Sequence, residues 1–98
     1  MQVGMRALTD GEMEALLERE PLWLLADGEL TRVWVFENFV EAIAFVSRVA
    51  EIAEKAQHHP DIDIRYNKVR LGLVTHDAGG VTKRDADMAG KLSREFPS

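Results

Sequence analysis

The sequence contains no cysteine, which excludes disulfide bonds, thiolate zinc sites and cysteine nucleophiles. It also lacks a long apolar run. The longest uninterrupted runs, Leu22 to Ala26 among them, are far shorter than the roughly 20 residues of a membrane-spanning helix. The first ten residues lack the apolar segment of a signal peptide. We therefore expect a soluble, cytoplasmic protein with no membrane partner.

Clustered basic charge is absent too. The 12 Lys and Arg residues are scattered along the chain rather than grouped into a stripe and are outnumbered by 17 Asp and Glu, which gives a formal net charge of −5. A negative protein repels phosphate backbones, so direct nucleic-acid binding is not expected. No repeat, linker or low-complexity segment divides the chain, and residues 1–98 are expected to form one domain. A domain this small buries only about two-thirds of its unfolded surface, so self-association would help it.

Three stretches carry helix signals. Thr9 with Glu12, and Thr82 with Asp85, have the spacing of a capping box, in which both side chains bond to backbone N–H groups at a helix start. Between them lies the longest periodic stretch, where small and apolar residues recur every three or four positions after Asn38. These signals predict helices over residues 10–20, 38–57 and 82–96.

Two hairpins are predicted between these helices. Asp27-Gly28 tolerates the positive φ of a tight turn and separates two apolar runs. Asn67-Lys68 is expected to turn a second pair, in which apolar and polar residues alternate. The predicted strands cover residues 23–26, 30–36, 61–66 and 69–75. The order αββαββα implies an α+β fold, a four-stranded antiparallel sheet with three helices packed on one face.

All three histidines lie between residues 58 and 76. His58 and His59 follow the second predicted helix, and His76 follows the last predicted strand. Adjacent histidines at a helix C-terminus can simply interact with the last carbonyls and the helix dipole. Their concentration beside Glu54 and Pro60 favours a site instead, and histidine both gives and takes protons near neutral pH. Acid/base catalysis is therefore predicted.

Metal binding is the alternative for the same residues. Glu54 and His58 lie one helical turn apart, and with His76 they would supply two histidines and one carboxylate, as in non-haem iron enzymes. Adjacent histidines rarely both point at one ion, however, and no HExxH or HxH spacing accompanies them. We therefore predict no metal ligand, although the residues alone do not name a substrate.

A dispersed motif joins these features. Its members are Glu54, His58-His59-Pro60, Tyr66-Asn67-Lys68-Val69, Thr75-His76-Asp77, Thr82 and Asp85. This motif resembles that of the pterin-4a-carbinolamine dehydratase family, known in animals also as the dimerisation cofactor of a homeodomain transcription factor. The resemblance covers nearly the whole chain from about Leu8.

The resemblance implies a four-stranded antiparallel sheet with three helices, in agreement with the order above. It implies dehydration of 4a-hydroxytetrahydropterin, the product of aromatic amino acid hydroxylases, to quinonoid dihydropterin and water in tetrahydrobiopterin recycling. No cofactor is implied. The expected partners are the pterin substrate and further copies of the chain, in a homodimer or homotetramer, with functional coupling to a hydroxylase. The alternative is a protein-interaction module or transcriptional coactivator that uses the same fold without catalysis.

On the matching positions, the resemblance makes His58, His59 and His76 the core of the site, with Glu54 orienting or tuning His58. The residues expected to bind the pterin from its two sides are Pro60, Thr75, Asp77, Ala78 and Asp85. Asp85 could be a site residue or a helix cap, because its capping-box position is a sufficient structural reason for an aspartate.

Overall fold

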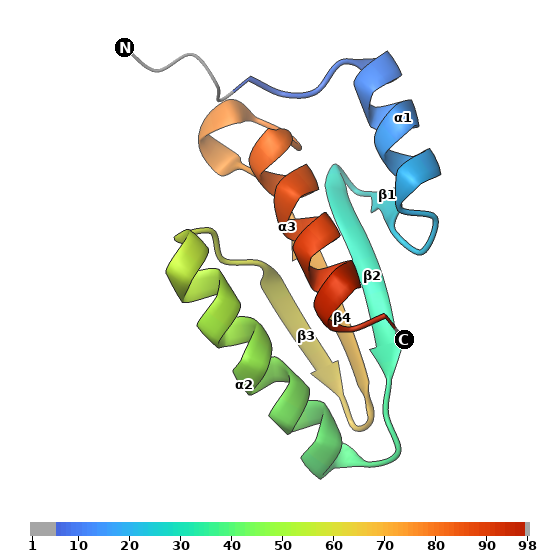
Figure 1. Cartoon of the computed structure of the whole chain (residues 1–98), viewed down its shortest axis with the longest axis vertical. Helices are drawn as coiled ribbons and strands as arrows, with labels where there is room; N and C mark the ends of the chain where they lie inside the picture. Colours follow the sequence, from blue (N-terminus) through green and yellow to red (C-terminus); the bar gives the residue numbers. More distant parts are fainter. Residues whose placement is uncertain (1–5, 98) are drawn as a thin grey trace.

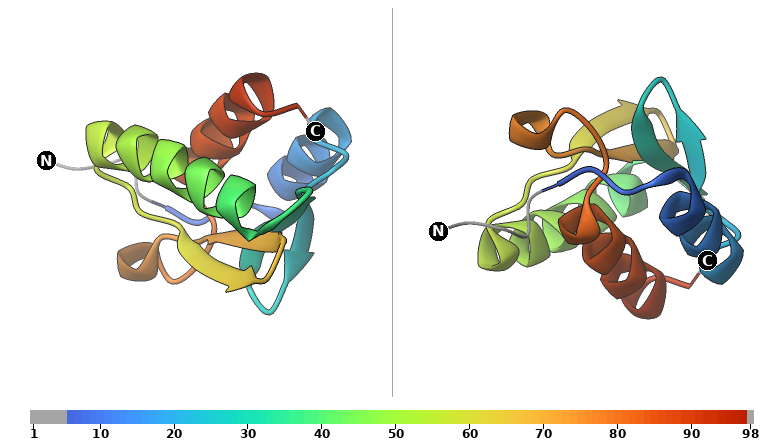
Figure 2. Two further views of the ribbon diagram at one scale, coloured as in Figure 1. Left: turned by 90° about the horizontal axis from the view of Figure 1, so that it is seen from below. Right: turned by 90° about the horizontal axis from the view of Figure 1, so that it is seen from above.

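The computed structural model describes residues 6–97 and has the predicted α+β fold. The elements in chain order are α1 (Asp10–Arg19), β1 (Leu24–Ala26), β2 (Glu29–Val35), α2 (Phe39–Ala56), β3 (Asp61–Arg65), β4 (Lys68–Leu73), the 3₁₀ turn η1 (His76–Ala78) and α3 (Lys83–Glu95). The strands form one antiparallel sheet in the order β1-β2-β4-β3. The three α-helices lie on one side of this sheet (Figures 1 and 2). Within residues 6–97, no helix is long and apolar enough to cross a membrane.

The three helices begin directly after the predicted capping residues. Both capping boxes are formed, Thr9 with Glu12 at α1 and Thr82 with Asp85 at α3. At α2, the Asn38 side chain accepts a hydrogen bond from the Glu41 N–H at 2.9 Å. Each cap satisfies backbone N–H groups that have no partner within the helix, so the three predicted helix starts are confirmed.

The first predicted hairpin is confirmed, but the second turns one residue earlier than expected. Arg65 pairs with Lys68, so the turn is Tyr66-Asn67 and not Asn67-Lys68. Tyr66 takes a positive φ of 56°, as a tight two-residue turn requires. Asn67 is fixed to the end of β2, because its Nδ2 donates to Phe36 O at 2.8 Å. This tertiary contact, rather than the local dipeptide, sets the turn.

Aromatic rings fill the space between the sheet and the helices. Trp34 of β2 packs edge-on against Trp23, with 5.8 Å between ring centroids, and lies 4.9 Å from Phe45 of α2. Phe45 in turn meets Phe96, just after α3, at 4.9 Å. Each fully buried large apolar side chain contributes about 1.5–3 kcal/mol. The cluster therefore fixes α2 and α3 on the sheet. It also fixes the ends of α2 and β4, after which the histidines lie.

The C-terminal end of α3 is attached to β2 by hydrogen bonds. Trp34 Nε1 donates to Phe96 O at 3.1 Å. Arg32, which is only 6 % exposed, donates to Ser93 Oγ at 3.2 Å and to Pro97 O at 3.1 Å. Burial lowers the pKa of this guanidinium. The backbone carbonyls of the two residues that follow α3 thus have hydrogen-bond donors on β2.

The opposite face of the sheet carries a carboxyl pair across Gly72 of β4. A Cβ at Gly72 would clash with Glu29 Oε1, so the glutamate lies directly against this glycine. A hydrogen bond to Asp61 raises the pKa of Glu29, and burial and the Asp61 charge raise this pKa further. Nearby Arg70 and His76 act in the opposite direction and lower it. Stabilisation by the shared proton is present below the ordinary glutamate pKa and is lost as pH rises through the raised value.

Candidate functional site

The two histidines that follow α2, His58 and His59, lie in different surroundings. Gln57 follows the helix in the left-handed conformation, with φ 54° and ψ 40°, which costs a non-glycine residue about 1–2 kcal/mol. The turn is closed by the His58 N–H, which donates to Ala53 O at 3.1 Å. After this reversal the His58 side chain is buried, at 10 % exposure, and the His59 side chain is 63 % exposed.

His58 binds the carboxylate of Asp85. The His58 Nε2 and Asp85 Oδ1 atoms are 2.5 Å apart, and the Asp85 side chain has no exposed surface. The other carboxylate oxygen accepts from Thr75 Oγ1 and from the Thr82 N–H, both at 2.8 Å. Residues from the end of α2, the end of β4 and the start of α3 therefore converge on one buried carboxylate. Asp85 both caps α3 and holds His58.

The hydrogen-bond network assigns the protons. Because Thr75 Oγ1 donates to Asp85, the Thr82 hydroxyl donates to Thr75 Oγ1 at 2.9 Å. An ionised Asp85 only accepts, so His58 Nε2 carries a proton toward it. Among residues 6–97, every buried side-chain N or O atom has a partner, and Nε2 is the His58 ring atom with a hydrogen bond. His58 Nδ1 is thus left accessible for chemistry.

Glu54 contacts His59, and the prediction that it orients His58 is wrong. Its Oε2 lies 2.7 Å from His59 Nε2. The left-handed Gln57 directs His58 toward Asp85 and brings His59 back to the last turn of α2, where Glu54 lies. The two side chains are 77 % and 63 % exposed, and a contact this exposed contributes about 0–1 kcal/mol. Glu54 therefore acts on the exposed histidine.

The three histidines line one cavity of about 360 Å³. His76 reaches it from η1, which the Ala78 N–H closes on Thr75 O at 3.0 Å. The residues that line the cavity are Gln57, His58, His59, Val74, Thr75, His76, Asp77 and Arg84. The histidines and two of the predicted binding residues are thus brought together.

The other predicted binding residues, Pro60, Ala78 and Asp85, are not in this lining. Asp85 has no exposed surface and lies behind His58 and Thr75. Through these two side chains it can position groups that face the cavity. Direct substrate contacts by Pro60 and Ala78 stay predictions.

Arg84, which is not among the predicted site residues, lines the cavity from the first turn of α3. Its Nη2 donates to Gln57 O at 2.6 Å and so joins the start of α3 to the end of α2. A signal was present in the sequence, because Lys83 and Arg84 place two cations at a helix N-terminus, where the macrodipole disfavours them. Such a placement indicates that the arginine has a partner outside its own helix.

The residues of the alternative metal site are not gathered as ligands. Glu54 lies on His59, and His58 Nε2 is engaged by Asp85. In the described part of the chain, no group of three or more His, Cys, Asp or Glu side chains is arranged to hold a metal ion. The geometry instead places a carboxylate-bound histidine and two exposed histidines around a small cavity, an arrangement suited to proton transfer.

Comparison with known proteins gives a consistent result. Residues 6–95 match the family model described as pterin 4 alpha carbinolamine dehydratase. Proteins provisionally named pterin-4-alpha-carbinolamine dehydratase are similar: that of Acidobacterium capsulatum is 57 % identical over 90 % of this chain and 96 % of its own, and that of Thermomicrobium roseum is 54 % identical over 91 % and 96 %. The crystal structure of a transcriptional coactivator/pterin dehydratase from Brucella melitensis superposes with a TM-score of 0.84 at 36 % identity, and covers 91 % of this chain and 97 % of that one.

Proposed function

The chain belongs to the pterin 4 alpha carbinolamine dehydratase family, and from that premise we propose that it converts 4a-hydroxytetrahydropterin to quinonoid dihydropterin and water. In this elimination the C4a–O bond breaks, the hydroxyl leaves with a proton as water, and loss of the N5 proton forms the C4a=N5 double bond. The step needs proton transfers and no redox change. The observation that carries the proposal is the convergence of three histidines from two segments on one cavity.

The geometry supports different roles for His58 and His76. His58 is the proposed base, because the buried Asp85 carboxylate 2.5 Å from Nε2 stabilises the imidazolium that forms when Nδ1 takes the N5 proton. His76, exposed on η1, is the proposed acid that protonates the leaving hydroxyl. His59, held by Glu54, is the proposed binding group beside them.

A stopped-flow measurement of 4a-hydroxytetrahydropterin dehydration tests this function. We expect the purified protein to accelerate the reaction, and we expect exhaustive chelation to leave the rate unchanged, because both proton transfers use side chains. Activity that returns only with an added divalent ion would contradict the histidine mechanism. If the protein does not accelerate the reaction under any condition, the dehydratase proposal itself is wrong.

A protein-interaction role is the second candidate, and exposed apolar residues on α2 favour it. Phe39 is 49 %, Val40 75 % and Ile43 37 % exposed, and the Brucella melitensis neighbour is described as a coactivator as well as a dehydratase. The stopped-flow measurement separates the two, because a module without catalysis leaves the uncatalysed rate unchanged.

We also propose that the chain forms a homodimer or homotetramer and acts in the cytoplasm on a pterin supplied by an aromatic amino acid hydroxylase. β1 pairs only with residues Glu29 to Thr31 of β2, so no strand among residues 6–97 pairs with the rest of β2 on that side. Val33 and Val35 there are 53 % and 62 % exposed. A strand edge of this kind pairs readily with a second copy. Light scattering should give a multiple of 11.0 kDa, and monomer alone at micromolar concentration would contradict self-association.

A further inference from the structure

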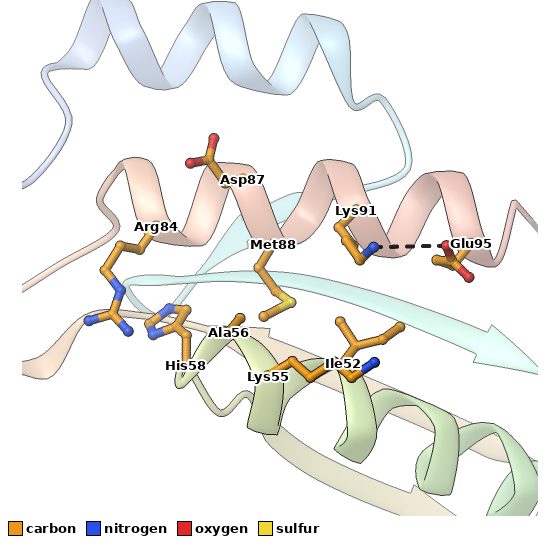
Figure 3. Close-up of a pocket in the computed structure, with 9 residues that line it drawn as sticks. All are labelled: Ile52, Lys55, Ala56, His58, Arg84, Asp87, Met88, Lys91 and Glu95. Carbon is orange, nitrogen blue, oxygen red and sulfur yellow. Dashed lines mark ion pairs between the residues drawn. The ribbon is translucent and has the colours of Figure 1, made fainter.

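A second cavity continues from the histidine site. It has a volume of about 610 Å³ and follows the space between the C-terminal half of α2 and α3 (Figure 3). His58 and Arg84 line both cavities, so the two meet at these residues. Arg84 lies at the junction, where its Nη2 donates to Gln57 O. A molecule that contacts the histidines can therefore extend past Arg84 into this groove.

The groove combines an apolar floor with charged walls. The apolar side chains are those of Ile52, Ala56 and Met88, and Met88 points across the groove toward α2 in Figure 3. From Arg84 to Glu95 the groove follows α3 for roughly 16 Å, at the 1.5 Å rise per residue of an α-helix. A groove of this length and volume can hold an extended substituent.

The two acids of the groove are matched by lysines of α3. Asp87 lies 3.0 Å from Lys83 and points away from α2 in Figure 3. Glu95 lies 4.0 Å from Lys91. Both pairs follow the i,i+4 spacing that brings side chains together on a helix. Neither acid therefore leaves an uncompensated negative charge in the groove.

Two cations that line the groove have no ion-pair partner among residues 6–97. Within residues 6–97, neither Lys55 of α2 nor Arg84 of α3 has a carboxylate within ion-pair distance. Arg84 binds only a backbone carbonyl, and Lys55 is exposed on the groove wall. In a chain whose formal net charge is −5, two unmatched cations beside an apolar floor favour a ligand with an apolar stem and an anionic end.

We propose that this groove is a substrate subsite that takes an extended substituent on C6 of the pterin, with an apolar linker that ends in a carboxylate or phosphate. The inference rests on the function proposed above and deepens it, because it assigns the substrate class that this chain prefers. The pterin ring lies at the histidines, the linker passes Arg84 onto the Met88 side of the groove, and the anion lies near Lys55.

Binding of three 7,8-dihydropterins tests the proposal by calorimetric titration. The first carries only a methyl group at C6, the second is 7,8-dihydrofolate, with an aryl linker and carboxylates, and the third is dihydroneopterin phosphate. We expect dihydrofolate to bind about tenfold more tightly than the methyl compound, because it buries the linker and places an anion among cations. The phosphate compound distinguishes a phosphate-tipped from a carboxylate-tipped tail.

Lys55→Gln and the matched control Lys68→Gln locate the effect. Both remove one exposed positive charge that has no ion-pair partner among residues 6–97, but Lys68 lies on β4 and does not line the groove. Lys55→Gln should lower the affinity for the preferred tailed compound about two- to fivefold, as expected of an exposed pair, and leave the methyl compound unaffected. Lys68→Gln should change neither.

Three outcomes would overturn the subsite. Equal affinity for all three compounds, or equal losses in both lysine variants, would do so and leave the dehydratase proposal standing, because the methyl compound still binds. Failure of every pterin to bind would overturn the subsite together with the proposed function.

Discussion

His76→Ala should lower the catalysed dehydration rate by about 100-fold or more, the usual contribution of a positioned acid or base. His76 starts the exposed η1 turn after β4, and its side chain is not part of the buried network around Asp85. Its loss should remove the proton donor for the leaving hydroxyl and leave the fold intact. The measurement is kcat in the stopped-flow assay, with circular dichroism recorded on the same sample.

Two further variants make this result interpretable. His58→Ala should reduce kcat by a similar factor, because it removes the proposed base. His59→Ala should act mainly on KM, because His59 is exposed and held only by Glu54. Wild-type turnover in both His58→Ala and His76→Ala, with unchanged circular dichroism, would show that the proposed roles are wrong.

Asp85→Ala should lower the free energy of unfolding by about 3–5 kcal/mol, the usual cost of removing one partner from a buried charged network. Its carboxylate accepts hydrogen bonds from His58, Thr75 and the Thr82 N–H, and all three donors would lose their acceptor. The capping box of α3 would be lost with it. Urea unfolding monitored by tryptophan fluorescence measures the change, and an unfolding free energy within 1 kcal/mol of wild type would contradict this account.

Asp85→Asn separates stability from catalysis. The asparagine oxygen can still accept from Thr75 and Thr82, so most of the fold stability should remain. Its NH₂ group would face the His58 Nε2–H, however, and two donors cannot bond to one another. His58 must then change tautomer and lose Nδ1 as a base, so kcat should fall by at least about tenfold. Full activity in a folded Asp85→Asn protein would show that Asp85 does not orient His58.

Most of the fold was predictable, because its signals are local. The capping boxes and Asp27-Gly28 act within four residues of themselves, and the structure follows them closely. The second turn was predicted one residue too late, because Asn67 makes its hydrogen bond to Phe36, the residue directly after β2. The amino acids of the turn alone do not reveal a contact with a residue so distant in the sequence.

The site was predictable as a set of residues but not as a set of contacts. The motif placed three histidines together, and one cavity joins them. It did not indicate which histidine Glu54 meets, because that depends on the left-handed φ of Gln57, a residue type with no strong preference for that conformation. The bond between His58 and Asp85 likewise depends on how α3 packs beside the end of α2.

The attachment of α3 at both ends makes the site sensitive to remote mutation. The first turn of this helix carries Asp85, and its last turn is held by Arg32 and Trp34 from β2, roughly 20 Å away along a 13-residue helix. A helix fixed at one end only could slide or tilt without breaking a hydrogen bond, whereas this one transmits a displacement along its axis. Random mutagenesis screened for activity should therefore find inactivating substitutions in the middle of β2, far from any histidine.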